Sequence, residues 1–352
     1  MEKGKTYYGS INIARGMAIL LVVLGHALSD IYLKESCGNP WLPQFFFVLI
    51  YSFHMPLFVF LSGFCNAGVL EQDTKGKRRQ FLWKRFRRLI IPYLSWGMLY
   101  VVLDIVGGNY TWQEFRISRY LIELLKGDNA NWQLWTLYTL FVCSLLSVIF
   151  YSWLQLSLEK MTMVFGVIAI SIAIMNGIPN LPRFLFYTII NTVLLYYFAF
   201  SVGILSRRRM LMEHSIWNCK TVVIVGLILI LFANAGVGTY LNRQMGLDTD
   251  WLKIVGAPVG VFVIVYLAVR IQNGRGRKFW DYLGNHCMSI YIFANICQVI
   301  VRKISMRGAF AMWPRIIFLL ISIVVSITIP VWIKKILVGR IKIARLVLLG
   351  EG

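Results

Sequence analysis

Charged residues are scarce in this sequence, and acidic residues are especially so. Only 14% of the 352 residues are charged, against roughly 25% in a soluble domain, and 15 Asp and Glu stand beside 36 Lys and Arg. With 58% hydrophobic residues, this composition excludes an ordinary soluble domain and predicts a polytopic membrane protein. Because basic residues of membrane proteins collect in cytoplasmic loops, the net charge of +21 predicts no nucleic-acid partner.

The sequence also lacks a recognisable cysteine motif and any sign of a domain boundary. The six cysteines show neither the paired spacing of a disulfide framework nor the spacing of metal ligands, so we expect neither a disulfide framework nor a metal. No linker, repeat or low-complexity stretch marks a separate soluble part. The sequence therefore predicts one integral-membrane domain over residues 1–352.

Apolar runs, by contrast, are abundant, and about 20 residues suffice for each to cross a bilayer. They lie at residues 11–29, 45–68, 88–107, 132–155, 161–176, 184–205, 220–236, 252–271, 286–304 and 310–337. The segments that this count places inside carry most of the basic residues, so the positive-inside rule puts both termini in the cytoplasm. The predicted fold is all-α, with about ten transmembrane helices. The loop at residues 107–131 is expected to hold an interfacial amphipathic helix.

The first apolar run carries two ionisable side chains, Arg15 and His26, with ten residues between them. This spacing is close to three helical turns, so both project from one face, about 16 Å apart along the axis. Ionisable groups inside a membrane are costly and usually face a protein interior or water. We expect His26 to be a general base and Asp30, four residues later, to orient its imidazole. A histidine bonded to a neighbouring helix for structural reasons alone is the alternative.

The second run contains FHMPLFVFLSGF at residues 53–64, with His54 and Pro56 near its middle. Proline frees a backbone carbonyl and bends a helix, and a membrane tolerates such a break only where protein or water satisfies the freed groups. His54 is therefore a second candidate catalytic residue, although a structural kink would also explain it. Ser62, a backbone N–H freed at the break, and an arginine are candidates for stabilising an oxyanion.

Two further motifs suggest ligand contacts. Arg85 and Arg88 are three residues apart in a basic segment, which suits phosphate groups at a cytoplasmic mouth as well as plain topological charge. Trp132 and Trp135 open the fourth run in NWQLWTLYTLF. Paired tryptophans are typical of a membrane interface, and they can also stack on sugar rings as a substrate platform.

Taken in order, these motifs resemble one family. Arg15 and His26, FHMPLFVFLSGF, RFRRLIIPY and NWQLWTLYTLF follow one another as they do in the membrane-bound acyltransferase-3 family. INIARGMAILLVVLGHAL followed by SFHMPLFVFLSGF is most similar to the fucose 4-O-acetylase-like branch. The specific motifs lie mainly in residues 11–140, and their combination carries the resemblance.

The resemblance implies a membrane O-acetyltransferase that uses cytoplasmic acetyl-CoA to acylate a cell-envelope or surface glycan. By that likeness His26 matches the catalytic histidine, Arg15 its essential basic partner, and Arg85 and Arg88 an arginine pair linked with CoA. The same likeness implies a bacterial inner membrane, contacts with membrane lipid and no metal. Relatives often have a histidine late in the penultimate helix, where this sequence has Asn295. The role of that later histidine is therefore in doubt here.

The charged part of CoA cannot enter lipid, so we expect its pantetheine arm to reach through a protein-lined path from Arg15 towards His26. Either direct transfer or an acyl-histidine intermediate fits these residues. A transporter or flippase of a glycan or another solute is the alternative function, because such carriers also bury His, Arg and Asp. Carriers often show inverted internal repeats, and we find none in the sequence.

Overall fold

The structure is a computed structural model that describes residues 9–33, 41–71, 74–106, 116–118, 120, 122, 132–177, 187–209, 219–246, 250–305, 312–336 and 340–351. Every regular element within these ranges is helical. The longer helices are α1 (Gly9–Leu28), α2 (Trp41–Tyr51), α3 (His54–Cys65), α4 (Lys75–Arg85), α5 (Ile91–Val106), α7 (Trp135–Ser147), α8 (Leu158–Gly177), α9 (Tyr187–Arg208), α10 (Thr221–Met245), α11 (Lys253–Ile271), α12 (Arg277–Asn285), α13 (Cys287–Ser305), α14 (Met312–Ile336) and α15 (Lys342–Leu349). Short helical segments of other types join or extend some of them. Three are π-helices, η1 (Ser29–Leu33), η3 (Phe86–Ile90) and η5 (Val148–Trp153), and three are 3-10 helices, η2 (Ala67–Glu71), η4 (Trp132–Leu134) and η8 (Asp250–Leu252).

The helices confirm the predicted fold class of an all-α polytopic membrane protein. Nine segments among the described residues are long and apolar enough to cross a membrane. They occupy nine of the ten predicted spans, and α9 occupies the remaining one, which was predicted at residues 184–205. The interfacial helix expected at residues 107–131 lies largely outside the described residues. The cytoplasmic position of both termini stays a prediction.

The chain forms two compact units, each built from separate stretches of sequence. Unit 1 comprises residues 1–61, 173–179 and 206–332, and unit 2 comprises residues 62–172, 180–205 and 333–352. The prediction of a single domain over residues 1–352 stays a prediction, and the two units are described separately.

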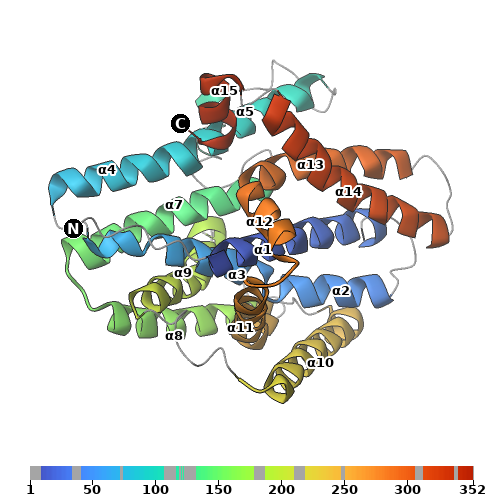
Figure 1. The fold of residues 1–352 in the computed structure, drawn as a ribbon, viewed down its shortest axis with the longest axis horizontal. Helices are drawn as coiled ribbons and strands as arrows, with labels where there is room; N and C mark the ends of the chain where they lie inside the picture. The colour runs from blue at the N-terminus through green and yellow to red at the C-terminus, as the bar shows by residue number, and fades with distance from the viewer. Residues whose placement is uncertain are drawn as a thin grey trace. The chain divides into compact units, whose positions relative to one another are not determined.

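In unit 1, α12 lies directly against the first half of α1 (Figure 1). A Cβ added to Gly16 would lie 2.2 Å from the carbonyl oxygen of Trp280, and one added to Gly284 would lie 2.2 Å from that of Asn12. The amide Nδ2 of Asn12 reaches the backbone and side chain of Asp281 at 3.2 and 3.1 Å. Lipid gives little hydrophobic drive for helix association, so close backbone approach and interhelical hydrogen bonds hold this pair together.

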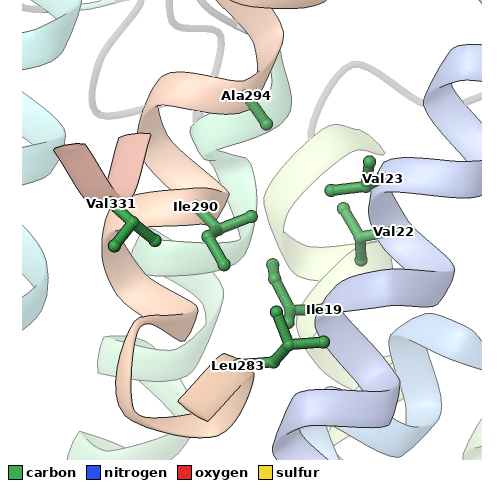
Figure 2. Packing of buried hydrophobic residues seen from close by; sticks show 7 residues of the cluster. All are labelled: Ile19, Val22, Val23, Leu283, Ile290, Ala294 and Val331. Atoms are coloured by element: carbon green, nitrogen blue, oxygen red, sulfur yellow. The ribbon is translucent and has the colours of Figure 1, made fainter. Parts of the chain in front are cut away.

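The second half of α1 packs through apolar side chains. Figure 2 shows this cluster, which contains Ile19, Val22 and Val23 of α1, Leu283 of α12, Ile290 and Ala294 of α13, and Val331 of α14. A polar bond also crosses this interface, where the buried amide of Gln298 donates to the carbonyl of Val23 at 3.0 Å. Helix α1 is therefore fixed along its length by α12 and α13.

In unit 2, the C-terminal helix α15 packs on α5. Trp96 Nε1 donates to the carbonyl of Leu348 at 2.9 Å, and the hydroxyl of Ser95 donates to the carbonyl of Val347. Gly350 ends α15 with a positive φ of 64°, and a Cβ there would lie 2.5 Å from the carbonyl oxygen of Arg88. The C-terminal segment therefore lies against Arg88 of η3 and the first turns of α5.

Candidate active site

The second predicted helix is broken, as its proline suggested, although the break lies before the proline. Helix α2 ends at Tyr51 and α3 begins at His54, so Pro56 occupies the first turn of α3, where its missing N–H costs little. The carbonyl of Ile50 accepts both the backbone N–H of Phe53, at 3.2 Å, and the His54 side-chain Nδ1, at 2.9 Å. The His54 side chain therefore helps to satisfy the backbone at the break.

Helix α11 packs directly against the two residues at this break. A Cβ added to Gly256 would lie 2.6 Å from Ser52 Oγ, and one added to Gly260 would lie 2.2 Å from Phe53 Cγ. Glycines four residues apart let helices approach closely in a membrane, and here they receive the two residues of the turn. The position of α3, and of His54 at its start, depends on this fit.

Tyr51, the last residue of α2, lies next to both histidines. Its hydroxyl is 3.2 Å from Nδ1 of His26, and its ring centroid is 4.6 Å from that of His54. Gly25 leaves room for it, because a Cβ at that position would lie 2.9 Å from the Tyr51 ring. Sequence reasoning missed Tyr51. The available signal was its place three residues before His54, combined with a glycine directly before His26.

These contacts constrain the protons on the two imidazoles. Nδ1 of His54 faces a carbonyl, which only accepts, so Nδ1 carries a proton, and in the neutral imidazole Nε2 then has a lone pair. His54 is only 2% exposed, and its side chain is bonded to the backbone carbonyl of Ile50. The Tyr51 hydroxyl can either donate to Nδ1 of His26 or accept from it. When it accepts, Nε2 of His26 is left as the basic atom.

Arg15 and Asp30 lie on either side of His26 along the chain. Helix α1 runs without interruption through Arg15 and His26, so their spacing of about three turns on one face is realised, and both side chains are half-buried. Asp30 is buried in the π-helical turn η1 and forms an ion pair with Arg302 of α13 at 3.5 Å. The predicted bond between Asp30 and the His26 imidazole stays a prediction.

Ser62 and Asn295 lie on α3 and α13, respectively. Ser62 is half-buried on α3 in unit 2, where the Asn66 amide donates to its carbonyl at 2.7 Å and lies 3.4 Å from its hydroxyl. Asn295 is buried on α13 in unit 1, next to Ala294 of the core cluster.

The arginine-rich segment lies in unit 2, and its geometry changes within the motif. Arg85 ends α4, half-buried, with its guanidinium 5.6 Å above the Phe81 ring, whereas Arg88 lies exposed in the π-helical turn η3. A π-helix has more residues per turn than an α-helix, so three-residue spacing no longer keeps side chains on one face as expected. Arg87, which sequence reasoning passed over, has a buried Nε that finds no hydrogen-bond partner among the described residues.

The predicted tryptophan platform is partly described. Trp132 begins η4, and its side chain lies outside the described residues. The half-buried ring of Trp135 stacks on Tyr196 with centroids 5.6 Å apart. One face of Trp135 is therefore occupied by a neighbouring ring.

The structure brings His26 and His54 together around Tyr51 in unit 1, with Arg15 and Asp30 on the same helical segment. Arg85, Arg88, Trp132 and Trp135 belong to unit 2. Within the described ranges, no three His, Cys, Asp or Glu side chains gather to hold a metal ion. The site thus offers imidazole and phenol groups in unit 1, and guanidinium groups in unit 2.

Comparison with known proteins gives a family match over nearly the whole chain. The family model described as "Acyltransferase domain" matches residues 8–335. The nodulation protein NolL of Sinorhizobium fredii is 33% identical over 105 residues, which is 28% of this chain and 27% of that protein. NolL of Mesorhizobium japonicum is 33% identical over 90 residues, 26% of this chain and 23% of that protein. The chain thus matches about a quarter of the length of these relatives, and no solved structure matches it.

Proposed function

This chain belongs to the membrane-bound acyltransferase-3 family, and from that premise we propose that it moves an acetyl group from cytoplasmic acetyl-CoA to a glycan hydroxyl. The acceptor is a cell-envelope or surface glycan, and the membrane is the bacterial inner membrane. The observation that carries the proposal is the pair of histidines around Tyr51, held on helices that are fixed by close backbone packing.

His26 acts as the general base. Its half-buried imidazole is hydrogen-bonded through Nδ1 to Tyr51, which orients the ring and leaves Nε2 for the acceptor hydroxyl. A positioned base typically contributes about 10²–10⁴-fold to the rate of a transfer reaction. His54 is buried and bonded to the backbone, so in this proposal it supports Tyr51 and the break in the helix.

The proposed transfer forms one bond, breaks one bond and moves one proton. The acceptor hydroxyl gives its proton to Nε2 of His26, and its oxygen forms a bond to the acetyl carbonyl carbon. The bond between that carbon and the CoA sulfur breaks, and the thiolate that leaves takes a proton, which His26 can return. An acetyl-histidine on the path would make His26 the nucleophile and divide the same balance over two steps.

The donor is held through its phosphates. Arg85 and Arg88 are the predicted contacts. Arg87 adds a third guanidinium in the same segment, and its buried Nε has no hydrogen-bond partner within the described part of the chain. Arginine suits phosphate because its planar fork donates two parallel hydrogen bonds. Arg15 lies about three turns before His26, where a cation can meet the donor arm on its way to the imidazole.

The direct test is acceptor-dependent acetylation by the purified chain in liposomes. Acetyl-CoA is supplied on one side, and free CoA is measured together with acetyl groups on envelope glycans by mass spectrometry. We expect CoA release that depends on added glycan, and envelope glycans that lose acetyl groups when the gene is deleted. Glycan crossing the bilayer without acetylation would instead support the transporter alternative, which buried His, Arg and Asp also allow.

A further inference from the structure

The first turn of α2 contains a buried amide that uses only one of its two polar atoms. Gln44 is 6% exposed, and its Nε2 donates to Oδ1 of Asn242 on α10 at 2.8 Å. Its Oε1 is also buried, and this oxygen finds no hydrogen-bond partner among the described residues. Most buried polar atoms are paired, because an unpaired one has lost its bond to water without a replacement. An interhelical bond to Asn242 accounts for one end of the amide and leaves the other end unexplained.

Gln44 lies on the face of α2 that leads to the histidine site. Phe47 and Tyr51 follow it by three and seven residues, which is close to one and two helical turns. The rings of Phe47 and Tyr51 stack with centroids 3.9 Å apart, and the Tyr51 hydroxyl lies 3.2 Å from Nδ1 of His26. At 1.5 Å per residue, Gln44 and Tyr51 are about 10 Å apart along the axis. One face of α2 therefore joins the amide to the proposed base.

An exposed tryptophan lies beside Gln44, three residues earlier on α2. Trp41 is 50% exposed, although its ring stacks on Phe45 with centroids 5.1 Å apart and an interplanar angle of 16°. Phe45 is itself buried in the apolar cluster that it forms with Val48 and Leu252. The indole is thus held from one side while half of the side chain stays exposed. The bond between Gln44 and its α10 partner is only partly buried, so a ligand can reach this end of α2.

We propose that Trp41 and Gln44 bind one sugar ring of the acceptor, next to the ring whose hydroxyl His26 deprotonates. The apolar C–H face of this ring packs on the indole. A ring hydroxyl, which both donates and accepts, pairs with the remaining end of the Gln44 amide. The subsite rests on the proposed function for its purpose, and by the predicted topology α2 begins at the outer face, where the glycan lies. Because the subsite is about 10 Å from Tyr51 along the helix, the preferred acceptor is an oligosaccharide and not a single sugar.

The test measures binding without any acetyl donor. Envelope glycans are stripped of O-acetyl groups with mild alkali, cut to mono-, di- and trisaccharides and labelled with fluorescein. Their binding to the purified chain in phosphatidylcholine nanodiscs is followed by fluorescence anisotropy. We expect the di- and trisaccharides to bind with roughly tenfold higher affinity than the monosaccharides, since one added hydrogen bond and one ring contact would give that factor. Equal affinity at all three lengths would overturn the subsite.

Two variants assign the gain in affinity to the two side chains. Gln44→Leu and Trp41→Ala should each weaken disaccharide binding about three- to tenfold and leave monosaccharide binding unchanged. Asn234→Ala is the control for a lost bond, because the Asn234 amide donates to the carbonyl of Leu252 at 3.2 Å. Phe46→Ala is the control for a lost ring, since Phe46 is 39% exposed on the opposite side of α2. Both controls should keep the wild-type affinity.

The same variants separate a ligand site from a structural role. If Gln44→Leu and Trp41→Ala lower Tm but bind disaccharides as the wild type does, the amide only joins α2 to α10, the indole only anchors the helix at the membrane interface, and the subsite is wrong. The proposed function is judged separately, by acetylation of the same oligosaccharides once acetyl-CoA is added. There Gln44→Leu should raise KM for the disaccharide with little change in kcat. Binding that depends on both side chains, in a chain that never acetylates, would overturn the proposed function and leave the subsite intact.

Discussion

The histidine region of unit 1 and the arginine segment of unit 2 differ in how their polar groups are held. Around His54, each described polar contact is fixed by a backbone carbonyl or a neighbouring ring inside an apolar interior. Along α4 and η3, Arg88 is exposed and Arg85 lies over a phenylalanine ring. Most buried polar groups have a hydrogen-bond partner, and the geometry of that bond indicates what the group can do. An exposed arginine such as Arg88 fits a role in topology as well as a role in ligand binding, so its geometry does not distinguish the two.

The largest loss of stability and activity is expected at α11, which packs against the break between α2 and α3. Gly260→Leu should destabilise the protein by about 1–3 kcal/mol or more and abolish transfer, because the new side chain meets Phe53 at the break. Thermal unfolding in detergent and the acetylation assay measure the two effects. Gly226→Ala on α10 is the control, since a Cβ there meets nothing within 4 Å. Normal stability and activity of Gly260→Leu would contradict the seating of the break on α11.

A smaller effect is expected at the residue that joins the histidines. Tyr51→Phe keeps the ring on His54 and removes the hydroxyl from His26, so kcat should fall by about 10–100-fold, the value of a hydrogen bond to a charged group. As a positioning residue, Tyr51 should also alter the pH dependence of kcat/KM when its hydroxyl is lost. Tyr197→Phe, which loses a buried hydroxyl contact to Ser147, is the matched control and should change neither. An unaltered pH profile for Tyr51→Phe would remove Tyr51 from the site.

The smallest effect is expected in the arginine segment. Arg87→Lys and Arg88→Lys should each raise KM for acetyl-CoA about three- to tenfold with little change in kcat, because lysine cannot reproduce the bidentate fork. Initial rates at varied acetyl-CoA measure this. Arg79→Lys, at an exposed position on α4, should leave KM unchanged. If all three variants behave alike, these arginines serve topology only, and the two regions differ in function as well as in burial.

The sequence predicted most of the fold, because long apolar runs have few alternatives in a membrane. It also predicted that α1 carries Arg15 and His26 in one continuous helix and that the second run breaks near Pro56. It did not predict Tyr51 or the support from Gly256 and Gly260, since these depend on which helices meet. Periodicity within one helix contains no information on that pairing.

The arginines illustrate a second limit. Ideal helical spacing put Arg85 and Arg88 on one face, but the π-helical turn η3 begins between them and changes the angle. A similar turn, η1, contains Asp30, which the structure pairs with Arg302, more than two hundred residues away in sequence. A sequence pattern scored at α-helical spacing does not reveal such turns.

The central claim is that the His26 imidazole takes the proton of the acceptor hydroxyl, and single-turnover acetylation by His26→Ala tests it most directly. His286→Ala is the control, because that half-buried histidine bonds the Tyr282 carbonyl, and the proposal gives it no role in transfer. We predict that His26→Ala slows transfer by about 10²–10⁴-fold while CoA binding persists, and that His286→Ala stays within about twofold of wild type. Wild-type rates from His26→Ala would contradict the account.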